Sequence, residues 1–170
     1  KKRALLSVWD KTNIIELAKF LIEHKFELIS TGGTQKLLND NDIKVTSVSD
    51  ITEFDEVMDG RVKTLHPRIF AGILADKNNK THLNDLKKMN TKAIDLVVVN
   101  LYPFEEMSSK TSLSLNKLIE YIDIGGPSML RAAAKNYDSI ITLCNPEMYE
   151  DFIIRYSNSK GNIDSNTRKL

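Results

Sequence analysis

The stretch Leu96-Val97-Val98-Val99-Asn100 decides the fold class of this 170-residue chain. A continuously apolar run of this length predicts a strand that is covered on both of its faces. Such strands are typical of a parallel sheet with helices packed on either side. The sequence around this run should therefore alternate between strands and helices.

The rest of the chain does alternate between short apolar runs and segments with helical spacing. Together with the first run, the candidate strands cover residues 4–8, 27–30, 44–48, 96–100 and 140–144. The candidate helices cover residues 14–22, 35–41, 82–90, 115–121, 128–136 and 147–156. This alternation predicts βαβ units and an α/β fold with a mainly parallel sheet. Thr12 and Asn13 are candidate caps of the first helix, with Glu16 placed to complete a capping box.

Composition narrows the class of protein. With 41% hydrophobic and 28% charged residues, the chain is typical of one globular domain. A net charge of +1 and the lack of a long apolar stretch predict neither a nucleic-acid nor a membrane partner. Cys144, the single cysteine, suits a reducing, cytoplasmic location, and its apolar surroundings predict a buried core residue. The sequence lacks the spacings of metal ligands, so we expect no metal.

Two polar loops follow the first two candidate strands, where ligands of open α/β sheets bind. The first loop offers the Ser7 hydroxyl and the Lys11 ammonium at the start of a helix, which suits a phosphate. The second, STGGT at residues 30–34, has paired glycines that let backbone N–H groups approach an oxyanion. Helix capping and a tight glycine turn are the alternatives for each loop alone, but two such loops together favour a shared phosphate site.

Residues 50–70 have neither a helical nor a strand period, and a long irregular segment is more often functional than idle. In an extended segment, Arg61 and Lys63 would lie on the same side, available to a phosphate or a developing oxyanion. For His66, which precedes Pro67, a structural role is the better interpretation.

Two later segments also carry polar groups suited to catalysis. Asn100 and Tyr102 share one side if the fourth strand continues, and could recognise a heterocycle or an oxyanion. Asp123 precedes a Gly-Gly-Pro loop in which Pro127 suits the first position of a helix. Lys135 lies on that helix and could form a proton-transferring pair with Asp123; a solvated cationic helix face is the alternative.

These segments, in order and with similar spacing, resemble the family of IMP cyclohydrolase domains, which form the N-terminal part of bifunctional purine biosynthesis proteins. The resemblance spans nearly the whole chain and is carried by residues 7–12, 30–34, 59–67, 100–104, 122–126 and 131–136. The glycine-threonine loop is shared with methylglyoxal synthase and with the regulatory domain of carbamoyl phosphate synthetase. The KTLHP and DIGG segments at residues 63–67 and 123–126 are the specific part.

The resemblance implies a methylglyoxal-synthase-like fold and the ring closure of 5-formamidoimidazole-4-carboxamide ribotide to inosine monophosphate, with no cofactor. It implies that residues 1–158 form this domain and that residues 159–170 begin a linker or helix toward a second domain. That domain would transfer a formyl group from 10-formyltetrahydrofolate to the aminoimidazole carboxamide ribotide. A homodimer is expected for the full-length protein.

The resemblance also implies roles for individual residues. Lys63 and Tyr102 would donate to the oxyanion, while Asp123 and Lys135 would handle protons. The substrate would be held by Ser7, Trp9, Asp10, Lys11, Thr31, Gly32, Gly33, Thr34, Arg61, Thr64, Asn100, Ile124 and Gly125. Trp9 departs from the family, in which many members carry a small hydroxyl residue, so only its backbone N–H is expected to contact the phosphate.

Two other functions remain open from the residues alone. A non-catalytic ligand-binding module needs the phosphate loops but not Lys63, Tyr102, Asp123 and Lys135 together. Methylglyoxal synthase acts on a triose phosphate with aspartates and a histidine from other segments, which have no counterpart that we can place here.

Overall fold

The structure is a computed structural model that describes residues 1–109 and 113–169. Within these residues, five parallel strands form one sheet in the order β3-β2-β1-β4-β5. The strands are β1 (Arg3–Val8), β2 (Glu27–Ser30), β3 (Thr46–Ser47), β4 (Leu96–Asn100) and β5 (Ile141–Leu143). The predicted α/β class is confirmed. The third strand is shorter than predicted, because a helix already begins at Val48.

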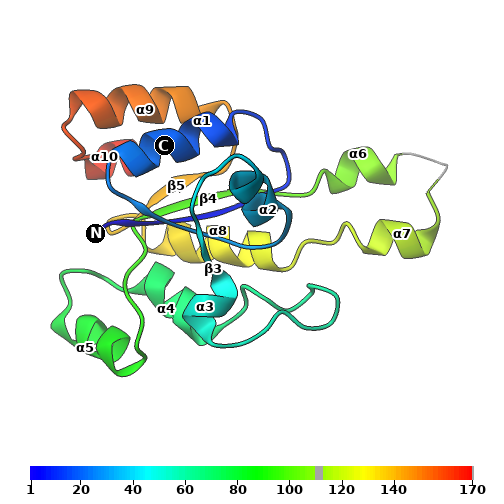
Figure 1. Cartoon of the computed structure of the whole chain (residues 1–170), viewed down its shortest axis with the longest axis horizontal. Helices are drawn as coiled ribbons and strands as arrows, with labels where there is room; N and C mark the ends of the chain where they lie inside the picture. Colours follow the sequence, from blue (N-terminus) through cyan, green and yellow to red (C-terminus); the bar gives the residue numbers. More distant parts are fainter. Residues whose placement is uncertain (110–112, 170) are drawn as a thin grey trace.

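Helices connect the strands and flank the sheet on both sides (Figure 1). They are α1 (Ile14–Glu23), α2 (Gly32–Asp40), α3 (Val48–Thr52), α4 (Pro67–Leu74), α5 (Lys80–Lys88), α6 (Phe104–Ser108), α7 (Leu115–Ile119), α8 (Gly125–Lys135), α9 (Met148–Asn158) and α10 (Ser165–Arg168). The sequence did not predict α3, α4 or α6. The irregular part of residues 50–70 is accordingly limited to the segment 53–66, which we call the loop 53–66.

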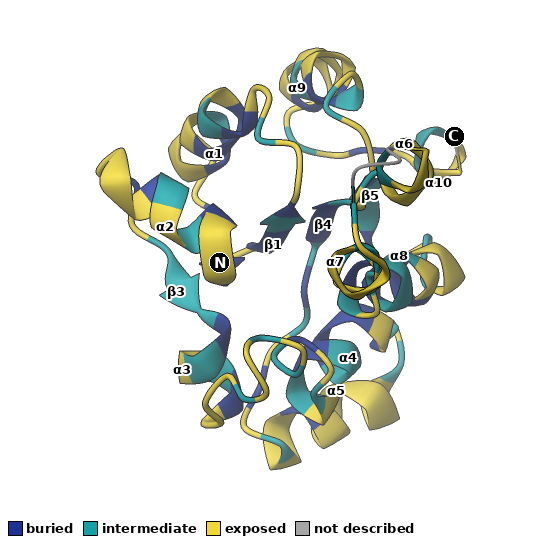
Figure 2. Ribbon diagram, turned by 90° about the vertical axis from the view of Figure 1, so that its right-hand side faces the viewer, coloured by how far each residue is buried: buried dark blue, intermediate teal, exposed yellow. Residues whose placement is uncertain are grey.

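Two apolar layers enclose the buried strands, as Figure 2 shows by the dark colour of β1 and β4 between the helices. Alternate side chains of β1 enter different layers, since successive residues of a strand point to opposite faces. Leu6 packs with residues of α1 and α9, such as Leu17 and Phe152. Leu5 packs with residues of α4 and α8, such as Ile73. The double coverage expected of the run 96–100 is therefore confirmed.

Several local expectations are wrong. The capping box of α1 does not form, because Asn13 adopts a left-handed conformation with φ 57° and makes no side-chain cap hydrogen bond. Pro127 is the third residue of α8 rather than the first, because the helix begins at Gly125. Cys144 is exposed rather than buried, since β5 ends at Leu143.

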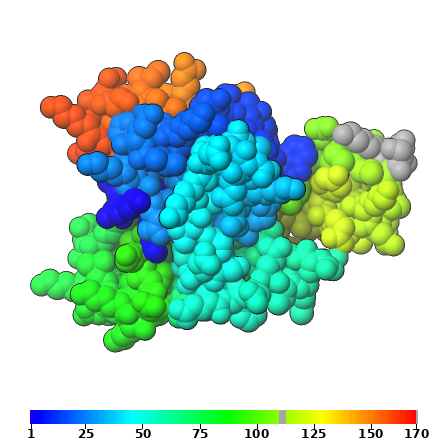
Figure 3. Space-filling model, in the orientation of Figure 1, coloured from blue at the N-terminus to red at the C-terminus, as the bar shows by residue number. Residues whose placement is uncertain are grey.

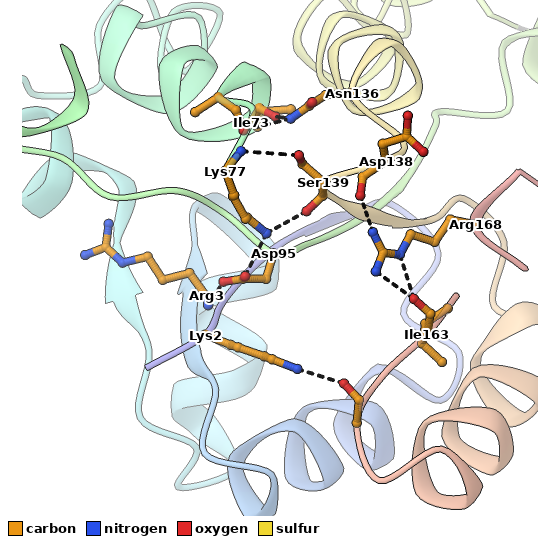
Figure 4. A network of polar contacts seen from close by, with 12 residues as sticks. Lys2, Arg3, Ile73, Lys77, Asp95, Asn136, Asp138, Ser139, Ile163 and Arg168 are labelled. Carbon is orange, nitrogen blue, oxygen red and sulfur yellow. Dashed lines mark hydrogen bonds and ion pairs between the residues drawn. The ribbon is translucent and has the colours of Figure 1, made fainter. Parts of the chain in front are cut away.

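A polar network ties together the amino-terminal edge of the sheet (Figure 4). Asp95, just before β4, accepts hydrogen bonds from the Arg3 backbone N–H at 2.7 Å and from Lys77 Nζ at 2.8 Å. Lys77 also donates to the Ser139 carbonyl ahead of β5 at 2.6 Å. These contacts connect the starts of β1, β4 and β5.

The helices α6 and α7 form an arm that protrudes from the body of the molecule (Figures 1 and 3). In the described part of the chain, neither helix contains a buried residue. By contrast, Ile163 ahead of α10 is buried in the layer with α1 and α9. None of the described helices has the length and apolar character required to cross a membrane.

Candidate functional site

A cavity of about 480 Å³ lies at the carboxyl ends of β1 and β4. From β1 the chain continues to β2 and β3 on one side of β1, and later to β4 and β5 on its other side. The strand order therefore reverses direction between β1 and β4. Such a switch point in an open α/β sheet leaves a crevice where ligands bind. The volume lies within the range of about 300–1,000 Å³ that is typical of small-molecule sites.

The cavity brings together most of the predicted site residues. Those lining it are Ser7, Trp9, Lys11, Thr31, Gly33, Thr34, Arg61, Lys63, Thr64, Asn100, Tyr102, Asp123, Ile124 and Gly125. The prediction missed Val8, Asp59, Gly60, Ile119, Glu120, Ile122, Gly126 and Met129. Half of the missed residues, namely Val8, Gly60, Ile122 and Gly126, directly adjoin predicted ones in the sequence. Glu120 follows α7 outside any motif, so no sequence signal pointed to it.

The end of β1 is held by a buried hydroxyl. Thr34 Oγ1 accepts a hydrogen bond from the Val8 N–H at 3.1 Å and donates to the Val8 carbonyl at 3.0 Å. Lys11 Nζ donates to the same hydroxyl at 3.1 Å and to the Val8 carbonyl. Thr34, predicted to bind the phosphate directly, therefore uses its hydroxyl to position Lys11 and the end of β1.

Replacing Thr34 by valine should destabilise the fold by about 1–3 kcal/mol, because the isosteric change leaves the buried Val8 N–H without its acceptor. The free energy of unfolding from urea titration measures this loss. The Thr12→Val variant removes an exposed hydroxyl nearby and serves as the control. Equal stabilities of the two variants would contradict the positioning role.

Asn100 also makes several hydrogen bonds within the protein. Its Oδ1 accepts from the backbone N–H groups of Trp9 at 2.7 Å and Asp10 at 2.8 Å, and its Nδ2 donates to the Asp10 carbonyl at 3.0 Å. In this structure Asn100 thus holds the Trp9 N–H, the group expected to contact the phosphate, and the predicted ligand contacts of both residues stay predictions. Asp10 lies outside the cavity lining, and hydrogen bonds from Thr12 lower the pKa of its carboxyl.

Two ammonium groups approach the start of α2. Gly32 has φ +55°, and a Cβ at this position would lie 3.2 Å from Lys63 Nζ, so the missing side chain makes room for the lysine. Burial and the nearby charge of Lys63 lower the pKa of Lys11. Glu56 lies 4.0 Å from Lys63, a distance too long for a strong pair. The two cations thus lack full compensation, which favours a multiply charged anion.

The N-termini of two helices add to the positive charge of Lys11 and Lys63. The N-cap residue of α2, Thr31, makes no side-chain cap hydrogen bond, and Gly33 in the first turn lines the cavity. At the start of α8, a Cβ on Gly125 would lie 2.7 Å from the hydroxyl of the buried Thr64. The N–H groups in the first turn of a helix carry a partial positive charge and bind phosphates readily.

Asp123 and Tyr102 form the other side of the cavity. Asp123 Oδ1 accepts from the Gly126 N–H at 2.8 Å, and a Cβ on Gly126 would lie 2.3 Å from Oδ2. The glycine therefore allows the carboxylate to sit against the helix start. Burial, followed by the charge of Asp123, raises the pKa of Tyr102, so the phenol stays protonated and can donate at neutral pH.

Lys135 does not reach this site, and the expected pair with Asp123 is absent from the structure. Lys135 is exposed at the last residue of α8, whereas Asp123 precedes the first. At 1.5 Å per residue, twelve positions correspond to about 18 Å. Gly32 also lies outside the lining, although it packs against Lys63.

The structure is that of an α/β domain with a cavity at the switch point of a parallel sheet, and comparison with known proteins makes the class specific. The family model for the MGS-like domain matches residues 13–128, so the chain belongs to the MGS-like domain family. This confirms the expected methylglyoxal-synthase-like fold. In the described residues, no group of three or more His, Cys, Asp or Glu side chains is placed to hold a metal ion.

Particular relatives are similar over nearly the whole chain. The bifunctional purine biosynthesis protein PurH of Staphylococcus aureus (strain USA300) is 51% identical over 157 residues, which is 92% of this chain and 32% of the relative. PurH of strain COL has the same identity and coverage. The chain thus spans about a third of the length of these relatives. The crystal structure of ForH matches with a TM-score of 0.84 and 31% identity, covering 99% of this chain and 87% of ForH.

Proposed function

We propose that this chain is an IMP cyclohydrolase domain, which converts 5-formamidoimidazole-4-carboxamide ribotide to inosine monophosphate. The observation that carries the proposal is the single cavity shared by the two lysines, Tyr102 and Asp123. The similarity to bifunctional purine biosynthesis proteins supports a purine ribotide as the ligand.

The phosphate of the ribotide binds at the start of α2 in this proposal. Lys11 supplies a cation there, and Gly33 and Thr31 supply backbone N–H and hydroxyl donors on the cavity wall. Ser7 and Thr64 lie on the same lining and add further donors. Anchoring the phosphate leaves the base to extend toward Tyr102 and Asp123 on the other side.

Ring closure then joins two groups of the same molecule. The carboxamide nitrogen forms a bond to the formyl carbon and loses one proton, while the formyl oxygen gains one. The resulting hydroxyl leaves as water with the proton of the formamido nitrogen. Lys63 and Tyr102 stabilise the developing oxyanion by donating hydrogen bonds, and Asp123 accepts the proton from the attacking nitrogen. Holding both reacting groups in one pocket contributes the remaining acceleration.

Mixing the chain with the formylated ribotide and following ultraviolet absorbance tests the proposal. We expect inosine monophosphate to form at a rate proportional to the protein concentration. Binding of the ribotide without turnover would instead support a non-catalytic ligand-binding module. Formation of methylglyoxal from a triose phosphate would support the synthase alternative.

The similarity to proteins about three times as long supports further proposals about the whole protein. We propose that a second domain carries the formyltransferase activity and uses 10-formyltetrahydrofolate, while the ring closure needs no cofactor. We also propose that the full-length protein is a cytoplasmic homodimer. The lone cysteine, which is exposed and unbridged, suits that location.

A further inference from the structure

An ion pair joins two residues of the cavity lining. Arg61, from the loop 53–66, donates from its Nη2 to Oε1 of Glu120, which follows α7 in the arm. Both side chains line the cavity, and they remain 66% and 58% exposed. The pair therefore joins two segments of the cavity lining that lie 59 positions apart in the chain.

The guanidinium of Arg61 is paired with this carboxylate. Within the described part of the chain, Glu120 is the acidic side chain that pairs with Arg61. An exposed pair of this kind is weak, because solvent screens both charges. A phosphate or another oxyanion forms charge-assisted, bidentate hydrogen bonds with a guanidinium and can replace a carboxylate that holds it only weakly.

Replacing the Glu120 carboxylate by a ligand oxyanion at Arg61 also requires that Glu120 be free to move away. The arm meets this requirement, since its described helices contain no buried residue that would fix it to the core. Its apolar side chains include Leu115, which is 71% exposed. A small displacement of the arm therefore disturbs little packing.

We propose that Glu120 is a specificity-determining residue, whose carboxylate holds Arg61 until an anionic ligand takes the place of that carboxylate on the guanidinium. A phosphorylated ligand brings enough charge to displace the carboxylate and gains Arg61 in return. A neutral nucleoside does not displace Glu120, and so gains nothing from Arg61. The proposal rests on the proposed function only in taking a phosphate monoester as the ligand.

The test compares ligand affinities of the wild type and the Glu120→Gln, Arg61→Ala and double variants. Trp9 is the only tryptophan and lines the cavity, so its fluorescence reports binding of inosine monophosphate and of inosine. Releasing a weak exposed pair should make Glu120→Gln bind inosine monophosphate about two- to fivefold more tightly. The affinity for inosine should not change, and in the Arg61→Ala background the second substitution should have no effect.

A matched control separates release of Arg61 from the loss of one negative charge. Asp59 lines the same cavity, and no ion pair of its side chain is seen within the described residues, so Asp59→Asn removes a charge without freeing an arginine. An equal gain in Asp59→Asn, or a gain that persists without Arg61, would overturn the proposal. So would an unchanged or weaker affinity in Glu120→Gln.

The outcome stays distinct from that of the proposed function. Inorganic phosphate serves as a second probe, since it needs no purine recognition. If inosine monophosphate fails to bind but phosphate shows the predicted pattern, the cyclohydrolase proposal fails and the role of Glu120 stands. If the ribotide is converted but Glu120→Gln leaves the affinities for inosine monophosphate and for phosphate unchanged, the cyclohydrolase proposal stands and the role of Glu120 fails.

Discussion

Replacing Lys63 by methionine should lower kcat for ring closure by about 10²- to 10³-fold, the loss typical of removing one oxyanion donor. Lys63 lies on the cavity wall beside Gly32, and its carboxylate partner, Glu56, is distant. Its ammonium is therefore available to charge that develops during the reaction. Methionine keeps most of the side-chain volume, so the cavity shape should persist.

The division between kcat and KM distinguishes this role from simple anion binding. We expect the affinity of Lys63→Met for inosine monophosphate to fall less than tenfold, because Lys11 and the start of α2 still hold the phosphate. Lys11→Met should show the opposite pattern, with a raised KM and a smaller change in kcat. Lys36→Met, an exposed position on α2, is the control for loss of a lysine. A large rise in KM with unchanged kcat for Lys63→Met would assign Lys63 to the phosphate instead.

The sequence locates the site well because its signals are local. Polar residues that directly follow an apolar run, such as Ser7 and Thr31, fall at the carboxyl edge of any parallel sheet, whatever the strand order. The general position of the cavity follows from that alone. A family resemblance adds which of these residues act together, as for Lys63 and Asp123.

The partners of the side chains could not be predicted in the same way. Asn100 and Thr34 have the residue types of ligand contacts, but their polar atoms are taken by the backbone at the end of β1. Which backbone groups lie within reach depends on the pairing of β1 with β4 and on the packing of α2, both of which are tertiary features. No local pattern encodes them.

The prediction that Lys135 pairs with Asp123 fails for a related reason. The GGP segment was interpreted as a loop, with a helix from residue 128, whereas α8 begins at Gly125 and runs away from the cavity. The spacing of residues along a helix defines its faces, but not the direction of its axis relative to the site. Glu120 cannot be predicted as a site residue from the sequence, because it follows α7 outside any motif.

Replacing Asp123 by asparagine should lower kcat by about 10²- to 10⁴-fold, the range expected for loss of a general base. The substitution is nearly isosteric, and the asparagine oxygen can still accept from the Gly126 N–H that Asp123 Oδ1 binds at 2.8 Å. The start of α8 should therefore keep its place, so any loss of activity reports the missing proton acceptor. The Asp138→Asn variant, far along the chain and outside the cavity lining, is the control.

A second measurement tests the same geometry without turnover. The charge of Asp123 contributes to the raised pKa of Tyr102, because a nearby negative charge disfavours the phenolate. Removing that charge should lower the pKa of Tyr102, which spectrophotometric titration measures as the difference between each protein and its Tyr102→Phe counterpart. If kcat falls in Asp123→Asn while the Tyr102 titration stays where it was, the carboxylate does not face the phenol. The loss would then have to be explained by the start of α8 rather than by a shared catalytic pocket.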